Sequence, residues 1–421
     1  MNLDNKYIFD GNFGLERETF RVTADGKPAL SPHPFPDSKY FDKDFCENQL
    51  ELITPVCKSV DDLMETLTKL DNEVKTELEK HGEYLWMNSN PPHFEREDDI
   101  KIAKFDGDKS FKLDYRLKLE KRYGRRLMTY SGIHFNFSFT EEFLKSIYDG
   151  ADSSDRIGSF KGFTSALYFR MSKYISRYGW LLVLLTAASP VYDLSLDGSS
   201  GSTGSYGGTG FDGCGSRRNG EKGYWNKFLP YLDYTNLETY VESIDNYIKT
   251  GELISAAELY LPMRLKPRGA NSLDGLLKNG VDHIELRMFD INPLSPIGIM
   301  REDLEFAHYF IIYLSDLPDF DYTPELQKAA IKNHRAAAGY DLDAMIINGY
   351  PARDAAAGLL DDMLIYYENV PKARESIKYQ LEKLTSNSRY CVRVYETLSG
   401  GFREKTLAEI KKQSCAALNL V

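Results

Sequence analysis

The most constraining feature of the sequence is a strict alternation in residues 131–139, which read Ser-Gly-Ile-His-Phe-Asn-Phe-Ser-Phe. Apolar side chains occupy positions 133, 135, 137 and 139, and glycine, histidine, asparagine and serine lie between or before them. A two-residue period is that of a β-strand, whose successive side chains point to opposite faces. One face of such a strand can pack on a core while the other stays polar, as in many antiparallel sheets. The sequence therefore predicts a sheet with one apolar and one polar face.

A second predicted strand, Phe13 to Val22, carries Glu16 and Glu18. On a helix these carboxylates would point about 200° apart, whereas on a strand they share a face. Turn-forming residues on both sides of the segment favour the strand. At 6–7 Å in an effective dielectric of roughly 20, two carboxylates repel by on the order of 2 kcal/mol. A site that buries them needs a cation, although this motif alone leaves open a solvated sheet face.

Three further segments are predicted to be strands: Asp44 to Pro55, Glu258 to Arg264, and Asp282 to Asp290. The last places His283, Glu285 and Arg287 on one face and apolar residues on the other. Helical periodicity predicts an amphipathic helix over 60–81 capped near Ser59, a buried helix from about 160 to 185, and several helices from Arg301 onward. The expected fold class is α+β, a curved antiparallel sheet with a polar ligand-binding face surrounded by helices. Residues 1–421 are expected to form a single catalytic domain, with sheet-forming motifs over about 11–300 and helices over about 301–421.

The segment from Asp197 to Gly215 is rich in glycine. It lacks the Gly-x-x-x-x-Gly-Lys-Ser/Thr pattern of a phosphate-binding loop. We interpret it as a flexible surface loop or lid rather than a phosphate cradle.

Composition narrows the possible partners. A net charge of −11 argues against nucleic acid or an anionic membrane as the main partner. The N-terminus has no apolar signal core, and the longest apolar run, Trp180 to Ala188, is too short to span a bilayer. We therefore expect a cytoplasmic location. Five widely spaced cysteines without a Cys-x-x-Cys pair indicate neither a disulfide framework nor a structural zinc site, and no obligate protein partner is evident.

The polar faces of the strands carry groups that suit a hard cation. Five carboxylates and one histidine form an oxygen-rich set suited to magnesium or manganese: Glu16, Glu18, Asp44, Glu51, Glu285 and His134. Arg264 and Arg287 would supply the clamps that phosphate or carboxylate ligands prefer. Together these groups indicate phosphoryl transfer. We expect neutralisation of one carboxylate, such as Glu285, to relieve repulsion in the set.

Each residue also has a structural explanation. His134 could be a hydrogen-bonded histidine of the sheet, and Glu285 and Arg287 could pair with each other. Tyr115 and Tyr224 could be core aromatic residues whose rings are exposed to solvent at one edge.

Several motifs, in order along residues 11 to 300, resemble glutamate–cysteine ligase (γ-glutamylcysteine synthetase) of the bacterial type. They are Gly14–Val22, Asp44–Phe45, Glu51–Pro55, Arg122–Gly124, Ser131–Ser138, Tyr178–Leu182, Ala188–Pro190, Glu258–Arg264, Ile284–Arg287 and Asp290–Gly298. Each motif is weak alone, but the joint match is specific. The resemblance implies a fold related to the catalytic core of glutamine synthetase.

The resemblance also implies residue roles. The six acidic and histidine residues named above match positions that hold magnesium ions and ATP phosphates, and Arg287 matches a phosphate-contacting arginine. Arg218 would bind the substrate glutamate, and with Glu285 and Arg287 it is a candidate catalytic residue. The positions that match the cysteine pocket are Tyr224, Tyr115, Arg116 and Tyr260.

The implied reaction joins the γ-carboxylate of L-glutamate to L-cysteine through a γ-glutamyl phosphate, with ATP as co-substrate. It is the first step of glutathione biosynthesis. The metal residues alone leave two alternatives open: a related carboxylate–amine ligase with another amine acceptor, and a non-catalytic sensor of nucleotide or glutamate.

Overall fold

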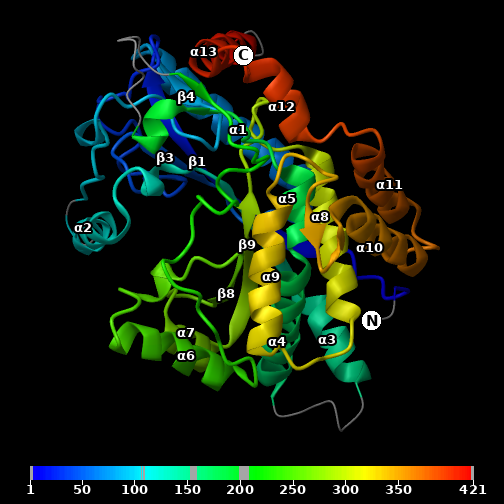
Figure 1. Ribbon diagram of the computed structural model, residues 1–421. Helices are drawn as coiled ribbons and strands as arrows, with labels where there is room; N and C mark the ends of the chain where they lie inside the picture. Colours follow the sequence, from blue (N-terminus) through cyan, green and yellow to red (C-terminus); the bar gives the residue numbers. More distant parts are fainter. Residues whose placement is uncertain (1–2, 106, 108–109, 152–158, 199–207, 419–421) are drawn as a thin grey trace.

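The computed structural model describes residues 3–105, 107, 110–151, 159–198 and 208–418. The strands of its main sheet are β1 (Gly11–Thr23), β2 (Phe41–Lys43), β3 (Gln49–Ile53), β4 (Glu83–Trp86), β5 (Ile133–Phe139), β8 (Met263–Pro267) and β9 (Val281–Phe289). They pair antiparallel in the order β2-β3-β1-β5-β9-β8, and β4 pairs with the C-terminal part of β1 (Figure 1). The predicted α+β fold with an antiparallel sheet is confirmed.

The predicted strand from Asp44 to Pro55 is wrong in extent. Residues 44–48 form a tight turn between β2 and β3, closed by a bond from the Asp44 N–H to the Gln49 carbonyl oxygen at 3.1 Å. Asp44 therefore stands in the turn of a hairpin, and only residues 49–53 pair with β1.

The predicted strand from Glu258 to Arg264 begins later than expected, at Met263. The chain before it forms the 3₁₀ turn η5 (Ala256–Glu258) and an irregular stretch. The Asn226 side chain bonds the Glu258 carbonyl oxygen at 2.7 Å and the Tyr260 N–H at 2.8 Å. Because a side chain satisfies these backbone groups, the stretch does not need a neighbouring strand.

Helices cover the apolar face of the sheet. Those on or near it are α1 (Val60–Glu79), α4 (Phe160–Tyr178), α5 (Trp180–Thr186) and α8 (Arg301–Asp316) (Figure 1). The Ser59 side chain caps α1 as predicted, accepting a bond from the Asp62 N–H. The single helix predicted over 160–185 is split at Gly179, where a Cβ would lie 2.6 Å from the Ile175 carbonyl oxygen. The alternating residues Ile133, Phe135, Phe137 and Phe139 are buried beneath these helices.

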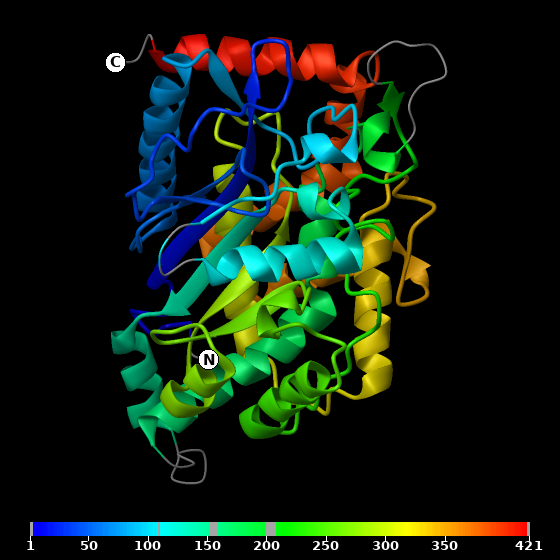
Figure 2. The same ribbon diagram turned by 90° about the vertical axis from the view of Figure 1, so that its left-hand side faces the viewer.

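The C-terminal region is helical, as predicted. Beyond α8 it contains α9 (Pro324–Ala337), α10 (Ala352–Tyr366), α11 (Pro371–Thr385), α12 (Tyr390–Leu398) and α13 (Phe402–Leu418). The helices that the periodicity did not indicate are α9, α12, α2 (Phe111–Tyr123), α3 (Glu141–Gly150), α6 (Leu237–Lys249) and α7 (Leu273–Asn279). In Figure 2 the cyan helix α2 crosses in front of the sheet, on its polar side. No helix within the described ranges is long and apolar enough to cross a membrane.

Residues 199–207 of the glycine-rich segment lie outside the described residues, so its interpretation as a loop or lid stays a prediction. Beyond it, β7 (Thr209–Gly210) pairs with β6 (Tyr192–Asp193), which precedes the 3₁₀ turn η4 (Leu194–Asp197). The remaining short elements are η1 (Glu97–Asp99), η3 (Leu127–Thr129), β10 (Ile346–Ile347) and β11 (Tyr350–Pro351).

Candidate active site

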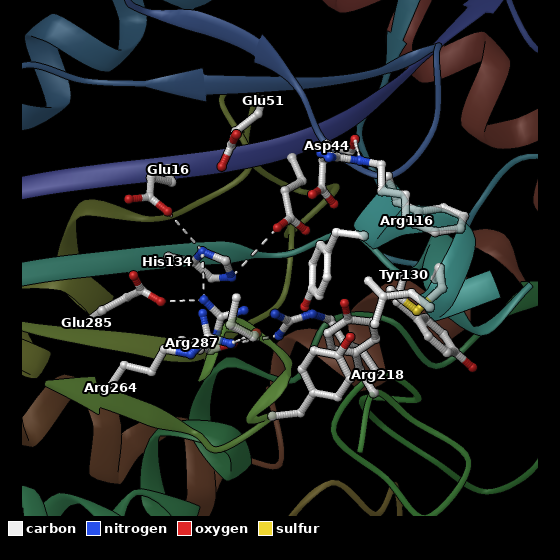
Figure 3. Close-up of a pocket in the computed structure, with 18 of the residues that line it drawn as sticks. Glu16, Asp44, Glu51, Arg116, Tyr130, His134, Arg218, Arg264, Glu285 and Arg287 are labelled. Carbon is white, nitrogen blue, oxygen red and sulfur yellow. Dashed lines mark hydrogen bonds and ion pairs between the residues drawn. The ribbon is translucent and has the colours of Figure 1, made fainter. Parts of the chain in front are cut away.

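A cavity of about 220 Å³ opens on the polar face of the sheet (Figure 3). Every site residue predicted from the sequence lines it: Glu16, Glu18, Asp44, Glu51, Tyr115, Arg116, His134, Arg218, Tyr224, Tyr260, Arg264, Glu285 and Arg287. The lining residues that sequence reasoning missed are Phe45, Leu119, Met128, Tyr130, Ala257 and Lys266. The fold thus gathers groups from β1, β3, β5, β8, β9, α2 and the loop over 216–226 around one space.

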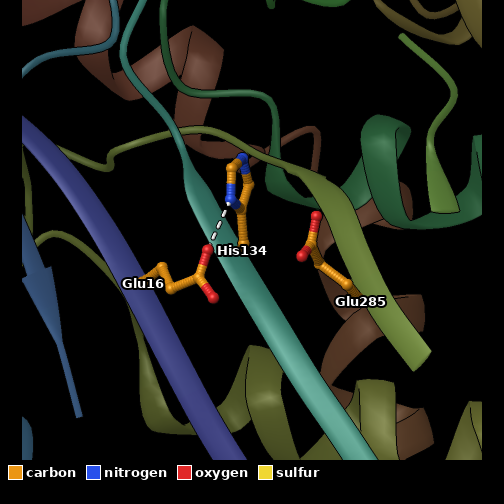
Figure 4. A group of neighbouring side chains, drawn as sticks. All are labelled: Glu16, His134 and Glu285. Carbon is orange, nitrogen blue, oxygen red and sulfur yellow. Dashed lines mark hydrogen bonds and ion pairs between the residues drawn. The ribbon is translucent and has the colours of Figure 1, made fainter. Parts of the chain in front are cut away.

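Three potential metal ligands come from three neighbouring strands (Figure 4). Glu16 of β1 is opposite His134 of β5, and Glu285 of β9 is opposite Asn136 of β5. Glu16, His134 and Glu285 each offer a ligand atom within 4.8 Å of the others, and His134 Nδ1 lies 3.1 Å from Glu16 Oε2. Burial and the nearby Arg287 lower the pKa of His134 to about 4. The imidazole is therefore neutral near pH 7 and able to act as a ligand.

A second acidic group lies at the β1–β3 side of the cavity. Glu18 and Glu51 face each other in the antiparallel register, with Asp44 in the adjacent turn. Burial, followed by the charge of Asp44, raises the pKa of Glu18 to about 8. Burial, followed by the charge of Glu16, raises the pKa of Glu51 well above its ordinary value. These carboxylates repel one another, as the sequence predicted, and would gain from a bound cation.

Glu285 contradicts the expected repulsion. Its carboxylate is fully buried and forms ion pairs with Arg287 on its own strand and with Lys266 on β8. Burial alone would raise the pKa of Glu285, but these two cations hold it well below its ordinary value. The predicted relief of repulsion on neutralising Glu285 is therefore wrong. The alternative that Glu285 pairs with Arg287 is confirmed, and Lys266 of β8 adds a second cation.

Lys266 could have been found from the sequence. It follows Arg264 by two residues, so any strand that includes both places them on one face. The register with β9, which sets Arg264 opposite Glu285, is not visible in the sequence.

Arg218 is fixed on two sides. Its Nη1 donates to the Arg287 carbonyl oxygen at 2.8 Å. Its guanidinium lies directly on Gly132, where a Cβ would be 2.3 Å from Cζ. Only glycine at position 132 leaves room for the side chain in this place.

The other arginines have backbone partners. Arg116 donates from Nε to the Asp44 carbonyl oxygen at 2.7 Å, so it supports the turn that carries Asp44. Arg264 donates from Nη2 to the Leu259 carbonyl oxygen at 3.1 Å.

Tyrosines form the wall opposite the acidic groups. The rings of Tyr224 and Tyr260 lie 4.2 Å apart between centroids, and Tyr115 of α2 lines the same side. Burial raises the pKa of all three hydroxyls, so they are neutral near pH 7. This wall offers aromatic surface and hydroxyl groups to a ligand.

The residues fit a magnesium or manganese ion. The donor set is carboxylate oxygen with one neutral imidazole, and His134 Nε2 has no hydrogen-bond partner within the described part of the chain. Two of the carboxylates lie in surroundings that disfavour their charge, as expected of groups that hold a cation.

A family model described as glutamate-cysteine ligase matches residues 2–254 and 230–336 of this sequence. The chain belongs to the glutamate–cysteine ligase family. The match covers the strands and loops that line the cavity.

Two similar curated proteins are bifunctional proteins of glutathione biosynthesis. That of Clostridium perfringens is 36% identical over 428 residues, covering 97% of this chain and 53% of that protein. That of Listeria monocytogenes is 38% identical over 404 residues, covering 90% of this chain and 51% of that protein. The chain spans about half the length of the curated relatives it matches.

Two solved structures share the fold of this family member. A bifunctional glutathione synthetase from Pasteurella multocida has a TM-score of 0.84 at 28% identity, covering 98% of this chain and 53% of that one. A glutamate–cysteine ligase from Francisella tularensis, in complex with AMP, has a TM-score of 0.85 at 23% identity, covering 97% of this chain and 89% of that one.

Proposed function

We propose that this protein uses ATP to join the γ-carboxylate of L-glutamate to the amine of L-cysteine, giving γ-glutamylcysteine, ADP and phosphate. The observation that carries the proposal is the cavity itself. In a chain of the glutamate–cysteine ligase family, it sets an acidic, metal-compatible surface against three arginines, Arg218, Arg264 and Arg287. Residues 1–421 would act as one catalytic unit.

The phosphoryl-transfer side would lie along β1, β3, β5 and β9. Glu16, Glu18, Asp44, Glu51, Glu285 and His134 would hold magnesium, or manganese in its place. The metal would neutralise charge on the phosphate oxygens. Arg287 and Arg264 would contact phosphate oxygens, and Lys266 would add a third positive charge on that side.

The amino-acid side would lie between Arg218 and the tyrosines. Arg218 would bind a carboxylate of glutamate, and its contacts with Gly132 and Arg287 fix its orientation before substrate arrives. Tyr115, Tyr224 and Tyr260, with the neighbouring Arg116, would line the cysteine pocket. Because the acyl phosphate is attacked by the substrate amine, the chain needs to supply no nucleophile. It binds and orients the reactants and excludes water.

Release of ADP in the presence of ATP, magnesium and glutamate tests the proposal, measured with and without a panel of amines. Turnover that depends on cysteine, with γ-glutamylcysteine identified by mass spectrometry, is the expected result. Turnover with another amine alone would assign a different carboxylate–amine ligase, and binding without turnover would assign a sensor.

A further inference from the structure

We propose that His334, near the end of α9, is a positioning residue that holds Arg218 in place from behind. The inference rests on the proposed function, in which Arg218 binds the substrate glutamate. His334 belongs to none of the motifs noted in the sequence.

A second, smaller cavity of about 30 Å³ lies behind the active-site wall. Four residues line both cavities and so form the partition between them: Arg218, Tyr224, Tyr260 and Arg287. His334, Asn219 and Trp225 line only the smaller one. His334 therefore lies on the far side of the partition from the substrate space.

The Arg218 guanidinium is confined on the side that faces the sheet, but the small cavity leaves free volume on its other side. Gly132 and the Arg287 carbonyl oxygen fix the side of the guanidinium toward the sheet. The small cavity is the free volume into which a guanidinium on a flexible stem can retreat, and His334 limits that volume.

The C-terminal end of α9 contacts the segment that carries Arg218. The Ala338 carbonyl oxygen accepts bonds from the N–H groups of Gly215 and Ser216, at 2.7 and 3.0 Å. At the other end of the segment, the rings of Trp225 and His334 meet edge to face with centroids 5.5 Å apart. Arg335 lies over the Trp225 ring at 4.8 Å. His334 thus belongs to a platform that holds the segment over 215–225 at both ends.

The His334 ring is uncharged. It is 1% exposed, and burial together with the charges of Arg218 and Arg335 lowers the pKa of His334 to about 3. A charged side chain here would repel Arg218, whereas a neutral ring does not. Shape and neutrality, rather than proton transfer, are the properties that the position requires.

The test compares His334→Ala, which enlarges the small cavity beside Arg218, with His334→Phe, which keeps a neutral ring. We expect His334→Ala to raise the KM for glutamate by about tenfold while the KM for ATP stays within about twofold, since only the glutamate contact loses its alignment. His334→Phe should restore the KM for glutamate to near the parent value.

His308→Ala is the matched control. His308 is also a buried neutral histidine, but it packs against Phe13 and Phe137 beneath the sheet, with ring centroids 5.0 and 5.2 Å away. The His308→Ala variant should have lower thermal stability, and its KM values for glutamate and ATP should not diverge. The inference is overturned if both KM values rise equally in His334→Ala, or if His308→Ala gives the same separation.

A readout without catalysis separates this inference from the proposed function. Hydrogen exchange of the segment over 215–225 in the free protein should be faster in His334→Ala than in the parent and in His308→Ala. If exchange is faster in His334→Ala but the parent shows no turnover, the ligase assignment is wrong and the role of His334 in holding the segment is supported. If the parent is active but exchange in His334→Ala equals that in the parent, the positioning role of His334 is wrong and the ligase assignment stands.

Discussion

Glu285 and Glu51 both face the active-site cavity, yet the structure predicts opposite effects on stability when each is neutralised. Glu285→Gln leaves Lys266 and Arg287 without their buried partner, so we expect the metal-free protein to lose about 3 kcal/mol. Glu51→Gln removes a carboxylate that burial and Glu16 disfavour, so its stability should be unchanged or higher. Denaturant unfolding in EDTA measures both. Equal destabilisation would mean that the two carboxylates have the same surroundings.

Gly132 makes room for Arg218, which leads to a prediction about glutamate affinity. In Gly132→Ala the three atoms nearest to the new Cβ all belong to the guanidinium at the flexible end of Arg218, so the fold should survive while the guanidinium is displaced. The KM for glutamate should rise by about tenfold or more, with little change for ATP. Gly14→Ala on β1 is the control, because its Cβ would come no closer than 3.5 Å to Asn136. Normal glutamate kinetics in Gly132→Ala would argue against Arg218 as the glutamate contact.

At the scale of single elements, the alternation of apolar and polar residues predicted β5 and most of β9. β5 follows its alternation closely, since a shift by one residue would turn phenylalanine toward the cavity. β9 follows its alternation as far as Leu286, beyond which its register with β5 shifts by one residue and Phe289 lies opposite Ile133. Errors arose where side chains replace strand pairing. The turn at Asp44 and the irregular stretch before β8 are both stabilised by residues distant in sequence, Arg116 and Asn226. Local sequence patterns do not indicate such distant partners.

Asn226 gives a prediction at this scale. Asn226→Ala leaves the Glu258 carbonyl and the Tyr260 N–H unpaired, which should cost roughly 1–3 kcal/mol for each buried group. Tyr260 should then shift, and the KM for cysteine should rise more than the KM for glutamate.

Gln327→Ala is the matched control for Asn226→Ala. Gln327 also bonds backbone groups, the N–H and carbonyl of Leu232, but it does not line the active-site cavity. It should lower stability and leave both KM values unchanged. A rise in the KM for cysteine in both variants would show that the effect follows from lost stability alone.

Across the whole molecule, the residues that gather at the cavity were predictable and their charge balance was not. Carboxylates and arginines on one strand face can be read from a two-residue period, and Glu16, Glu18, His134, Glu285 and Arg287, which that period set on polar faces, line one cavity. Arg218 and the tyrosines were expected from the family resemblance alone. Which cation meets which carboxylate depends on strand order and register, as the pairing of Lys266 with Glu285 shows. The support of Arg218 by α9 depends on packing between segments more than 100 residues apart, which no local pattern encodes.

Buried histidines make acid sensitivity a property of the whole fold. His308 sits among aromatic rings, and burial lowers its pKa to about 3, whereas an unfolded chain titrates near 6.5. As the pH falls from about 6.5 to 3, the unfolded state binds a proton that the folded state does not. Each such histidine therefore removes stability at about 1.4 kcal/mol per pH unit. The loss is absent above pH 6.5, where the imidazole is neutral in both states.

The prediction is that His308→Phe flattens the fall in unfolding free energy between pH 6 and 4 by about 1.4 kcal/mol per pH unit relative to the parent. The difference between the two proteins at pH 8 measures the packing effect alone and is subtracted. Urea unfolding at a series of pH values gives both curves. Parallel curves would mean that His308 is protonated in the folded state, which would require water or an acid partner among the rings of Phe13 and Phe137.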